Sequence, residues 1–265
     1  MREVIIIRNE APDPAVHVVS ALRAAGLPFR FVMPPDGERL PDLDQIMGLV
    51  VLGGSQHADD YAGHPYLLDE QRLLVRAIER AVPVLGICLG AQILGLAAGG
   101  KLLPSPVREL GFNPVHPTSA GRQDLITSGY DPGDLVFHWH EDIVDLPAGA
   151  TVLLRGEQVA DQAYRFGSCA WGVQFHPEVT LEVIREWFAA SGDLKPVWGK
   201  SWADVLEDAH RHLASAERRA RELIAGFVSA LPRPRLRPGH RAGQPRGLAD
   251  GGDWRRSRSR PAPRP

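Results

Sequence analysis

The 265-residue chain has 44% hydrophobic residues, an ordinary share for a globular protein and enough for a sizeable core. Its formal charge of −2 is unevenly distributed: residues 231–265 carry +8, which leaves −10 on residues 1–230. An acidic body argues against nucleic-acid binding by the folded part. The two cysteines, Cys88 and Cys169, are far apart and form no C-x-x-C pair, which excludes a disulfide framework and a zinc-finger signature.

Membrane and export signals are missing from the pattern of apolar residues. The run 4–7 is too short for a signal peptide, and no stretch reaches the ~18 apolar residues of a membrane span. We therefore expect a cytoplasmic protein that does not contact a membrane.

The first hundred residues alternate between short apolar runs and amphipathic helical patterns. Strands are expected at 4–7, 29–33, 49–52 and 84–87, and helices at 15–25, 64–81 and 92–98. Because continuous apolar strands alternate with helices, this half predicts a mostly parallel sheet covered on both faces.

From residue 101 the strands become shorter and more polar, and turns rich in Gly, Pro and Asp separate them. Strands are expected at 101–103, 112–115, 135–139, 151–155, 163–166 and 170–175, and helices at 181–190 and 202–229. We interpret the polar strands as an antiparallel extension of the same sheet. The expected organisation is one domain, residues 1–230, which includes the last helix, and a disordered Pro- and Arg-rich tail, residues 231–265.

A strand, a tight turn and a helix meet around Cys88. A short apolar run precedes it, Gly86 and Gly90 flank it, and an apolar, helix-permissive run begins at Gln92. This is the pattern of a nucleophile elbow, with Cys in place of Ser. A helix that starts directly after Cys88 favours the thiolate and leaves the N–H of Leu89 free to hold an oxyanion. The structural alternative is a buried, unreactive cysteine at a strand end, and the flanking glycines alone do not decide between the two.

A second motif ends the last predicted strand. His176 can act as a general base and acid, and Glu178, two residues later, points the same way from an extended backbone. Pro177 biases His176 towards that extended conformation. A carboxylate beside a histidine orients the ring and raises its basicity, as in a Ser-His-Asp triad. Because ligand sites in open α/β sheets lie outside the carboxyl ends of the strands, we expect this motif and Cys88 to form one site.

Together the motifs resemble the class I, triad-type glutamine amidotransferase domain, and in particular the amidotransferase domain of GMP synthase. The similarity rests on the stretches 86–92 and 172–178, on the Gly53-Gly54 pair after a strand, and on Gly99-Gly100 followed by 108–111. It covers roughly residues 1–195, in the same order and spacing. It implies an α/β fold with a flavodoxin-like, mostly parallel central sheet, helices on both faces and an antiparallel extension.

The resemblance also implies catalytic roles. Cys88 is the nucleophile that attacks the glutamine carboxamide, and the N–H groups of Gly54 and Leu89 hold the tetrahedral oxyanion. His176 gives a proton to the departing ammonia and then activates water against the thioester. Glu178 orients His176.

The same resemblance places glutamine in a pocket formed by Gly53, Gln92, Trp139 and His140. Gln92 would contact the amino-acid end of glutamine, and the stretch 139–142, Trp-His-Glu-Asp, aligns with a Ser-His-Gly-Asp stretch of the family. No cofactor is implied.

This chain departs from the family pattern at several positions. Trp139 replaces a small residue and Glu141 replaces Gly, which allows a reshaped pocket or a different γ-glutamyl group. Ser55-Gln56 follows the Gly-Gly pair where the family usually has Pro. His138 is additional and is interpreted as a histidine of the pocket rim or surface rather than a ligand.

A metal site is not expected. Two histidines and two aspartates lie close together in the loop after Gly54, and we interpret them as solvated loop residues. They are His57, Asp59, Asp60 and His64.

Three functions remain open at this point. The first is a glutamine amidotransferase that releases ammonia to a separate synthetase subunit, because the sequence contains no phosphate-binding loop with Lys-Ser/Thr. The second is a freestanding γ-glutamyl hydrolase or peptidase with the same three catalytic residues. The third is a non-catalytic binding module, against which the intact Cys88, His176 and Glu178 argue.

Overall fold

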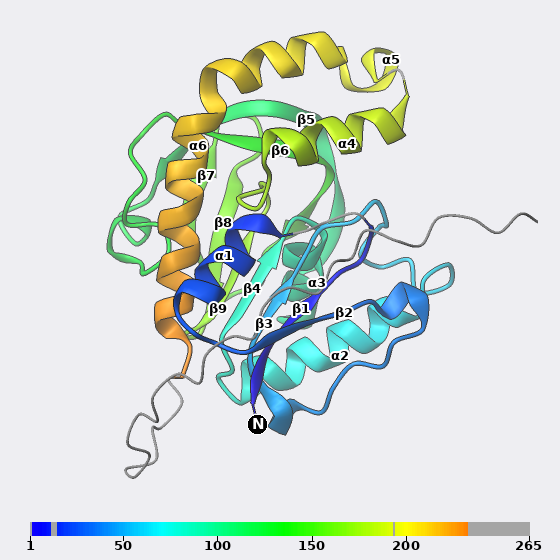
Figure 1. Cartoon of the computed structure of the whole chain (residues 1–265), viewed down its shortest axis with the longest axis vertical. Helices are drawn as coiled ribbons and strands as arrows, with labels where there is room; N and C mark the ends of the chain where they lie inside the picture. Colours follow the sequence, from blue (N-terminus) through cyan, green and yellow to red (C-terminus); the bar gives the residue numbers. More distant parts are fainter. Residues whose placement is uncertain (1, 12–14, 193, 233–265) are drawn as a thin grey trace, which may run out of the picture. The chain divides into compact units, whose positions relative to one another are not determined.

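The computed structural model describes residues 2–11, 15–192 and 194–232. These residues belong to one structural unit that ends at Pro232 (Figure 1). Residues 233–265 of the predicted tail lie outside the described residues, so its disorder and the domain boundary after residue 230 stay predictions. In the described part of the chain, no helix is long and apolar enough to cross a membrane.

A single nine-stranded sheet forms the centre of this unit, in the order β2-β1-β3-β4-β9-β8-β7-β5-β6. The parallel half consists of β1 (Glu3–Ile7), β2 (Phe29–Val32), β3 (Ile46–Val51), β4 (Val84–Ile87) and β9 (Ala170–Val173). The antiparallel half consists of β5 (Lys101–Pro117), β6 (Asp134–Asp145), β7 (Thr151–Gly156) and β8 (Asp161–Phe166). Because β9 pairs in parallel with β4 and antiparallel with β8, it joins the two halves. The predicted fold class, a parallel core with an antiparallel extension, is therefore confirmed.

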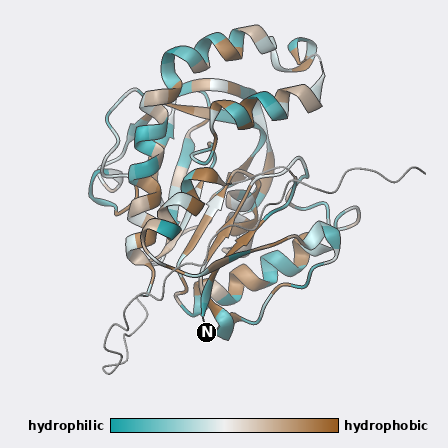
Figure 2. Ribbon diagram, viewed as in Figure 1, coloured by the Kyte–Doolittle hydropathy of each residue, from teal (hydrophilic) through white to brown (hydrophobic). Residues whose placement is uncertain are grey.

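Helices cover both faces of the parallel half. The described residues form the helices α1 (Val16–Ala24), α2 (Tyr66–Glu79), α3 (Leu89–Ala97), α4 (Leu181–Ser191), α5 (Lys195–Trp198) and α6 (Trp202–Ala230), with short 3-10 turns at Pro34–Asp36, Leu43–Gln45 and Gly121–Gln123. Of these, α1, α2, α3 and the end of α6 pack on the parallel half. Successive strand side chains point to opposite faces. Val4 and Ile6 accordingly pack in the core under α1 and the end of α6, whereas Ile5 and Ile7 pack in the core under α2 and α3. Figure 2 shows the hydrophobic colouring concentrated on these buried strands.

A third apolar cluster lies beside the antiparallel half. There α4, α5 and the first half of α6 are gathered next to β5 and β6 (Figure 1). Phe112 and Phe137 of the strands contact Val183, Ile184 and other apolar side chains of the helices in one buried group. Two caps fix the helix starts, because Thr180 accepts a hydrogen bond from the N–H of Val183 and a capping box links Ser201 with Asp204. This cluster holds α4 over the edge where the candidate site lies.

Several predicted boundaries were wrong. The strands expected at 101–103 and 112–115 are one long strand, β5, whose register with β6 shifts between Pro104 and Glu109. The prolines in this strand suggested a break, but a bulge accommodates residues that cannot donate ladder hydrogen bonds. The strand expected at 170–175 ends at Val173, and α5 was not predicted at all.

Candidate active site

Cys88 sits at the apex of a strained turn between β4 and α3. Its φ of 50° and ψ of −108° lie in a region that residues with a Cβ rarely adopt. The flanking glycines are required by space: a Cβ on Gly86 would lie 2.5 Å from the carbonyl oxygen of Gly90. A Cβ on Gly90 would overlap the carbonyl oxygen of Val51 in the neighbouring strand. The predicted elbow is therefore present, and its strain is carried by the residue that bears the thiol.

The thiol of Cys88 is enclosed by the two halves of the sheet. The Cys88 N–H donates to the carbonyl of Val173 at 2.8 Å, which ties the turn to β9. The Sγ atom lies 3.8 Å from the carbonyl oxygen of Trp139 and 3.7 Å from Nε2 of Gln174, which donates to it. Only 5% of the residue is exposed, at the bottom of a cleft. The sulfur thus faces a restricted space that admits a small group from one direction.

His176 and Glu178 form a buried pair directly after β9. His176 Nδ1 lies 2.7 Å from Oε1 of Glu178, and the two side chains are 5% and 0% exposed. The His176 N–H donates to the carbonyl of Phe137 at 2.8 Å, so β6 fixes the backbone of the histidine. Nε2 of His176 has no hydrogen-bond partner among the described residues. The carboxylate holds one ring nitrogen, and the other remains available to a ligand.

The pair sets the charge of the histidine. Burial by itself lowers the pKa of His176, but the electrostatic attraction of Glu178 and Cys88, with the hydrogen bond to Glu178, outweighs it. The result is a pKa well above 6.5. At neutral pH the arrangement therefore favours an imidazolium at His176, the form that can donate a proton.

The Gly53-Gly54 loop lies against the same side chains. A Cβ on Gly53 would be 3.1 Å from Cε1 of His176 and 3.6 Å from Cβ of Cys88. A Cβ on Gly54 would lie 2.9 Å from the side chain of Leu89, the first residue of α3. The N–H groups in the first turn of a helix have no partner within the helix. The two predicted oxyanion donors, Gly54 and Leu89, are therefore neighbours across the elbow.

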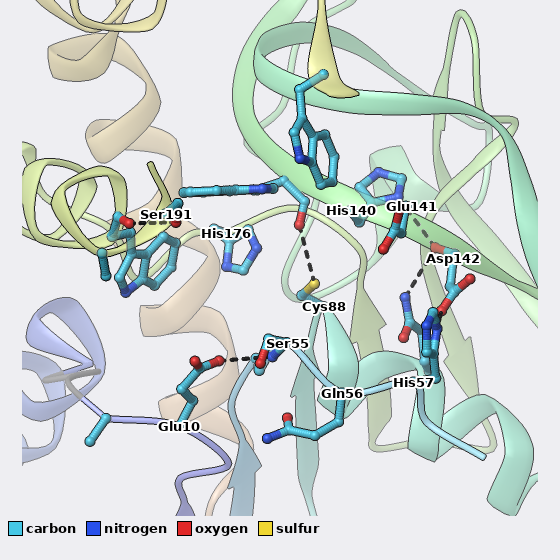
Figure 3. A pocket seen from close by; sticks show the side chains of 18 of the residues that line it. Glu10, Ser55, Gln56, His57, Cys88, His140, Glu141, Asp142, His176 and Ser191 are labelled. Carbon is cyan, nitrogen blue, oxygen red and sulfur yellow. Dashed lines mark hydrogen bonds and ion pairs between the residues drawn. The ribbon is translucent and has the colours of Figure 1, made fainter. Parts of the chain in front are cut away.

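A cleft of about 280 Å³ opens above Cys88, a size suited to a small molecule (Figure 3). Seven of the nine predicted site residues line it, namely Gly53, Gly54, Cys88, Gln92, Trp139, His140 and His176. Leu89 and Glu178 lie behind these residues and are 1% exposed each. In Figure 3, His176 and Ser191 lie on one side of Cys88, and His140, Asp142 and His57 lie on the other.

Gln92 and Asp142 are joined on the far side of the cleft. Gln92 Nε2 donates to the carbonyl of Asp142 at 3.0 Å and approaches Oε1 of Gln174 at 3.4 Å. The Asp142 carboxylate lies 2.5 Å from Nδ1 of His57, and this hydrogen bond, with the charge of Asp142, raises the pKa of His57 above 6.5. His57 is exposed to solvent, as predicted, because 59% of its side chain is accessible. It also lines the cleft.

The prediction for His138 was wrong. Its side chain is 1% exposed and lies below the cleft rather than at a rim or on the surface. Because β6 places residues 138 and 140 on the same face of the sheet, both rings meet Glu109 of β5. Glu109 Oε2 is 2.9 Å from Nε2 of His140 and accepts a hydrogen bond from Gln162 Nε2 at 2.7 Å. Ligand atoms of Glu109, His138 and His140 lie within 4.8 Å of one another, but Oε2 of Glu109 is already engaged by His140 and Gln162.

Sequence patterns missed the residues that α4 and neighbouring loops bring to the cleft. The helix was predicted, but its pattern did not identify Trp187 as a residue of the site. In the structure the Trp187 ring meets His176 edge-on with centroids 5.1 Å apart. Glu10, Glu186 and Trp198 also line the cleft. None of these residues belongs to a motif, so only the docking of α4 and α5 beside the elbow reveals them.

The chain matches the model of the class-I glutamine amidotransferase family over residues 16–189 and belongs to that family. It is thus a triad-type amidohydrolase by class, related to the amidotransferase domains of GMP synthases. The predicted resemblance is confirmed.

Several curated proteins are similar to part of the chain. It is 36% identical to the glutamine amidotransferase-like protein YfeJ of Salmonella typhimurium over 56% of this chain and 64% of that protein. It is 37% identical to the GMP synthase of Porphyromonas gingivalis over 53% of this chain but only 27% of the enzyme. A γ-glutamyl-L-1-hydroxyisopropylamide hydrolase from a Pseudomonas species is 31% identical over 50% of this chain and 47% of that protein. The chain therefore spans less than two thirds of each of these relatives.

A solved structure matches over most of both chains. The glutamine amidotransferase of Methylobacillus flagellatus superposes with a TM-score of 0.83 at 27% identity, covering 91% of this chain and all of that one.

Proposed function

We propose that this protein hydrolyses the side-chain amide of glutamine to glutamate and ammonia through a thioester on Cys88. The observation that carries the proposal is the alignment of a strained, enclosed thiol with the buried His176–Glu178 pair at the bottom of one cleft. A thiolate beside an imidazolium is the activated form of a cysteine nucleophile.

Each step uses a group of this chain. The Cys88 thiolate attacks the carboxamide carbon, and the N–H groups of Gly54 and Leu89 stabilise the developing oxyanion; one such donor is worth about 10²–10³ in rate. His176 transfers its Nε2 proton to the nitrogen as the carbon–nitrogen bond breaks, and ammonia leaves. His176 then takes a proton from water, which attacks the thioester and releases glutamate. Glu178 holds the ring in position through Nδ1.

The glutamyl part is proposed to lie on the side of Gln92 and His140, and Trp139, whose ring meets Trp187 of α4, borders it. Gln92 is oriented by its hydrogen bond to the carbonyl of Asp142, and His140 by Glu109. Gly53 keeps the opposite wall thin enough for the carboxamide to reach Cys88. Such fixed polar groups in a small cleft favour one orientation of an amino-acid ligand.

For the ammonia we propose a separate synthetase subunit as the acceptor. Ammonia released into water at neutral pH is mostly protonated and is no longer a nucleophile, so a partner that docks over the cleft would preserve it. The test is glutamate and ammonia release from glutamine by the purified protein, alone and with cell extract, against Cys88→Ala. Slow, Cys88-dependent release that extract stimulates supports this function, and no release under either condition rejects it.

A second candidate is a freestanding γ-glutamyl amide hydrolase with the same thioester chemistry. Two observations favour it: the Pseudomonas relative is named as a hydrolase of such an amide, and the bulky rings of Trp139 and Trp187 meet each other in the lining of the cleft. Brisk cleavage of γ-glutamyl amides with little glutaminase activity supports this candidate over the first.

A further inference from the structure

We infer that the cleft contains a subsite for the leaving group, built to receive an organic amine that carries a second positive charge on a short carbon stem. The inference rests on the proposed thioester chemistry at Cys88. It assigns a role to Glu10, Trp187, Glu186 and Trp198, which that chemistry does not use.

The position of His176 indicates where the leaving group of the substrate lies. The proton that departs with the amine comes from Nε2, so the amide nitrogen sits beside this ring when the carbon–nitrogen bond breaks. Nε2 has no partner among the described residues and is therefore free to face it. In Figure 3, Glu10, His176 and Ser191 lie on one side of Cys88, whereas His57 and Asp142 lie on the other. Residues on the His176 side are thus placed to meet the leaving group.

Aromatic rings wall this side of the cleft. Trp187 meets His176 at 5.1 Å between centroids and Trp139 at 6.1 Å, and Trp139 also contacts Phe188 at 4.8 Å and Trp198 at 6.2 Å. These rings support one another, so the wall is built before a ligand arrives. Ammonia has no carbon with which to contact indole rings, whereas the methylene stem of an alkylamine can bury apolar surface against them.

Two of the four carboxylates that line the cleft have no cationic partner among the described residues. Glu141 is paired with Arg108 at 2.8 Å and Asp142 with His57 at 2.5 Å, which leaves Glu10 and Glu186. Among the described residues, neither of these two forms an ion pair, although Glu10 accepts the Ser55 N–H at 2.8 Å.

Carboxylates and indole rings that line one cleft are a combination that attracts an organic cation. The imidazolium of His176 repels a second charge close to the amide nitrogen, so the charge is favoured only some carbons away, at the rim. The subsite therefore fits an ω-ammonium alkyl chain.

The proposed reaction is a hydrolysis that balances with water alone. The Cys88 thiolate forms the carbon–sulfur bond as the carbon–nitrogen bond breaks, and His176 gives the proton that makes the leaving group a neutral amine. Water then attacks the thioester, His176 takes its proton, and the carbon–sulfur bond breaks. The products are glutamate and the free amine, which water protonates.

Three substrates test the subsite: glutamine, γ-glutamyl-n-pentylamide and γ-glutamyl-(4-aminobutyl)amide. The two amides have stems of equal length and differ in the terminal group, methyl against ammonium. We expect kcat/KM for the ammonium amide to exceed that for the pentyl amide by about 5- to 10-fold, and this ratio to fall as salt is raised. The Glu186→Gln variant and the Glu10→Gln, Glu186→Gln double variant should bring the ratio stepwise towards 1.

The ratio separates charge recognition from damage to the site, because a disturbed loop lowers both rates. Glu157→Gln, at a surface glutamate paired with His116, is the matched control and should leave the ratio unchanged. A wild-type ratio of 1 or below, or a ratio that the double variant does not change, overturns the inference. Turnover of glutamine without turnover of either amide overturns it as well and leaves the thioester chemistry standing, whereas inert behaviour towards all three rejects the proposed function itself.

Discussion

The Glu178→Gln substitution tests the role proposed for the buried pair most directly. Glutamine has nearly the same shape and can still accept a hydrogen bond from Nδ1 of His176, but it carries no charge. Without the carboxylate, the burial that lowers the pKa of His176 is opposed only by Cys88, so this pKa falls. The ring then holds its proton less often and is less firmly oriented.

We expect kcat for glutamine hydrolysis to fall by about 10²–10⁴, because general acid–base catalysis and the orientation of the ring are both affected. The basic limb of the pH–rate profile should move to lower pH. Glutamate release measured from pH 5 to 10, with Glu157→Gln as the control, gives both the change in kcat and the position of the basic limb. A kcat within tenfold of wild type together with an unmoved basic limb would refute the reasoning.

The same variant has a stability signature whose sign follows from the pKa. The folded pKa of His176 lies above the unfolded value of about 6.5, so the pair stabilises the fold fully below that pH. This contribution is lost as pH rises through the raised folded pKa. Breaking a buried pair costs about 3–5 kcal/mol, and the glutamine keeps one hydrogen bond. We therefore expect the free energy of unfolding of Glu178→Gln to be about 2–3 kcal/mol lower than that of the wild type at pH 6. Urea unfolding should show that the difference in unfolding free energy between wild type and variant becomes smaller at alkaline pH.

Three further predictions follow from local geometry. Cys88→Gly should abolish turnover yet stabilise the fold by about 1 kcal/mol, because glycine adopts the positive φ of 50° without strain. Cys88→Ala keeps a Cβ and should show no such gain when both variants are unfolded by chemical denaturant. Gly53→Ala should lower kcat/KM by about 10², since its methyl group meets His176 at 3.1 Å, and an unaltered rate in a folded variant would contradict this. Burial raises the pKa of Glu70 to about 8, so the wild type loses stability as pH rises from about 4.5 to 8.5, whereas a Glu70→Gln variant has no carboxyl to ionise. The free energy of unfolding of the variant should therefore gain on the order of 4 kcal/mol relative to the wild type over this range. Calorimetric stability curves of the two proteins that run parallel across the range would contradict this.

Local patterns were sufficient for the class of fold and for the two motifs. Continuous apolar runs predicted the parallel strands, since a strand buried on both faces has no polar side, and helical spacing predicted α2, α4 and α6 close to their observed bounds. The glycines around Cys88 indicated the elbow because only residues without a Cβ allow its turn to approach β3. The sequence also placed His176 and Glu178 two residues apart, the spacing at which their side chains meet in the structure.

The cleft itself was decided by long-range packing. The third apolar cluster docks α4 and α5 beside the antiparallel half, which brings the ring of Trp187 against His176. The ladder between β5 and β6 buries His138 with Glu109, although nothing in the local sequence distinguishes it from a surface histidine. A chain carries its chemical groups and short-range conformational preferences in its sequence. Which groups from distant elements share one cavity depends on how sheets and helices pack. This is why the two motifs were predictable from the sequence and the other residues around the cleft were not.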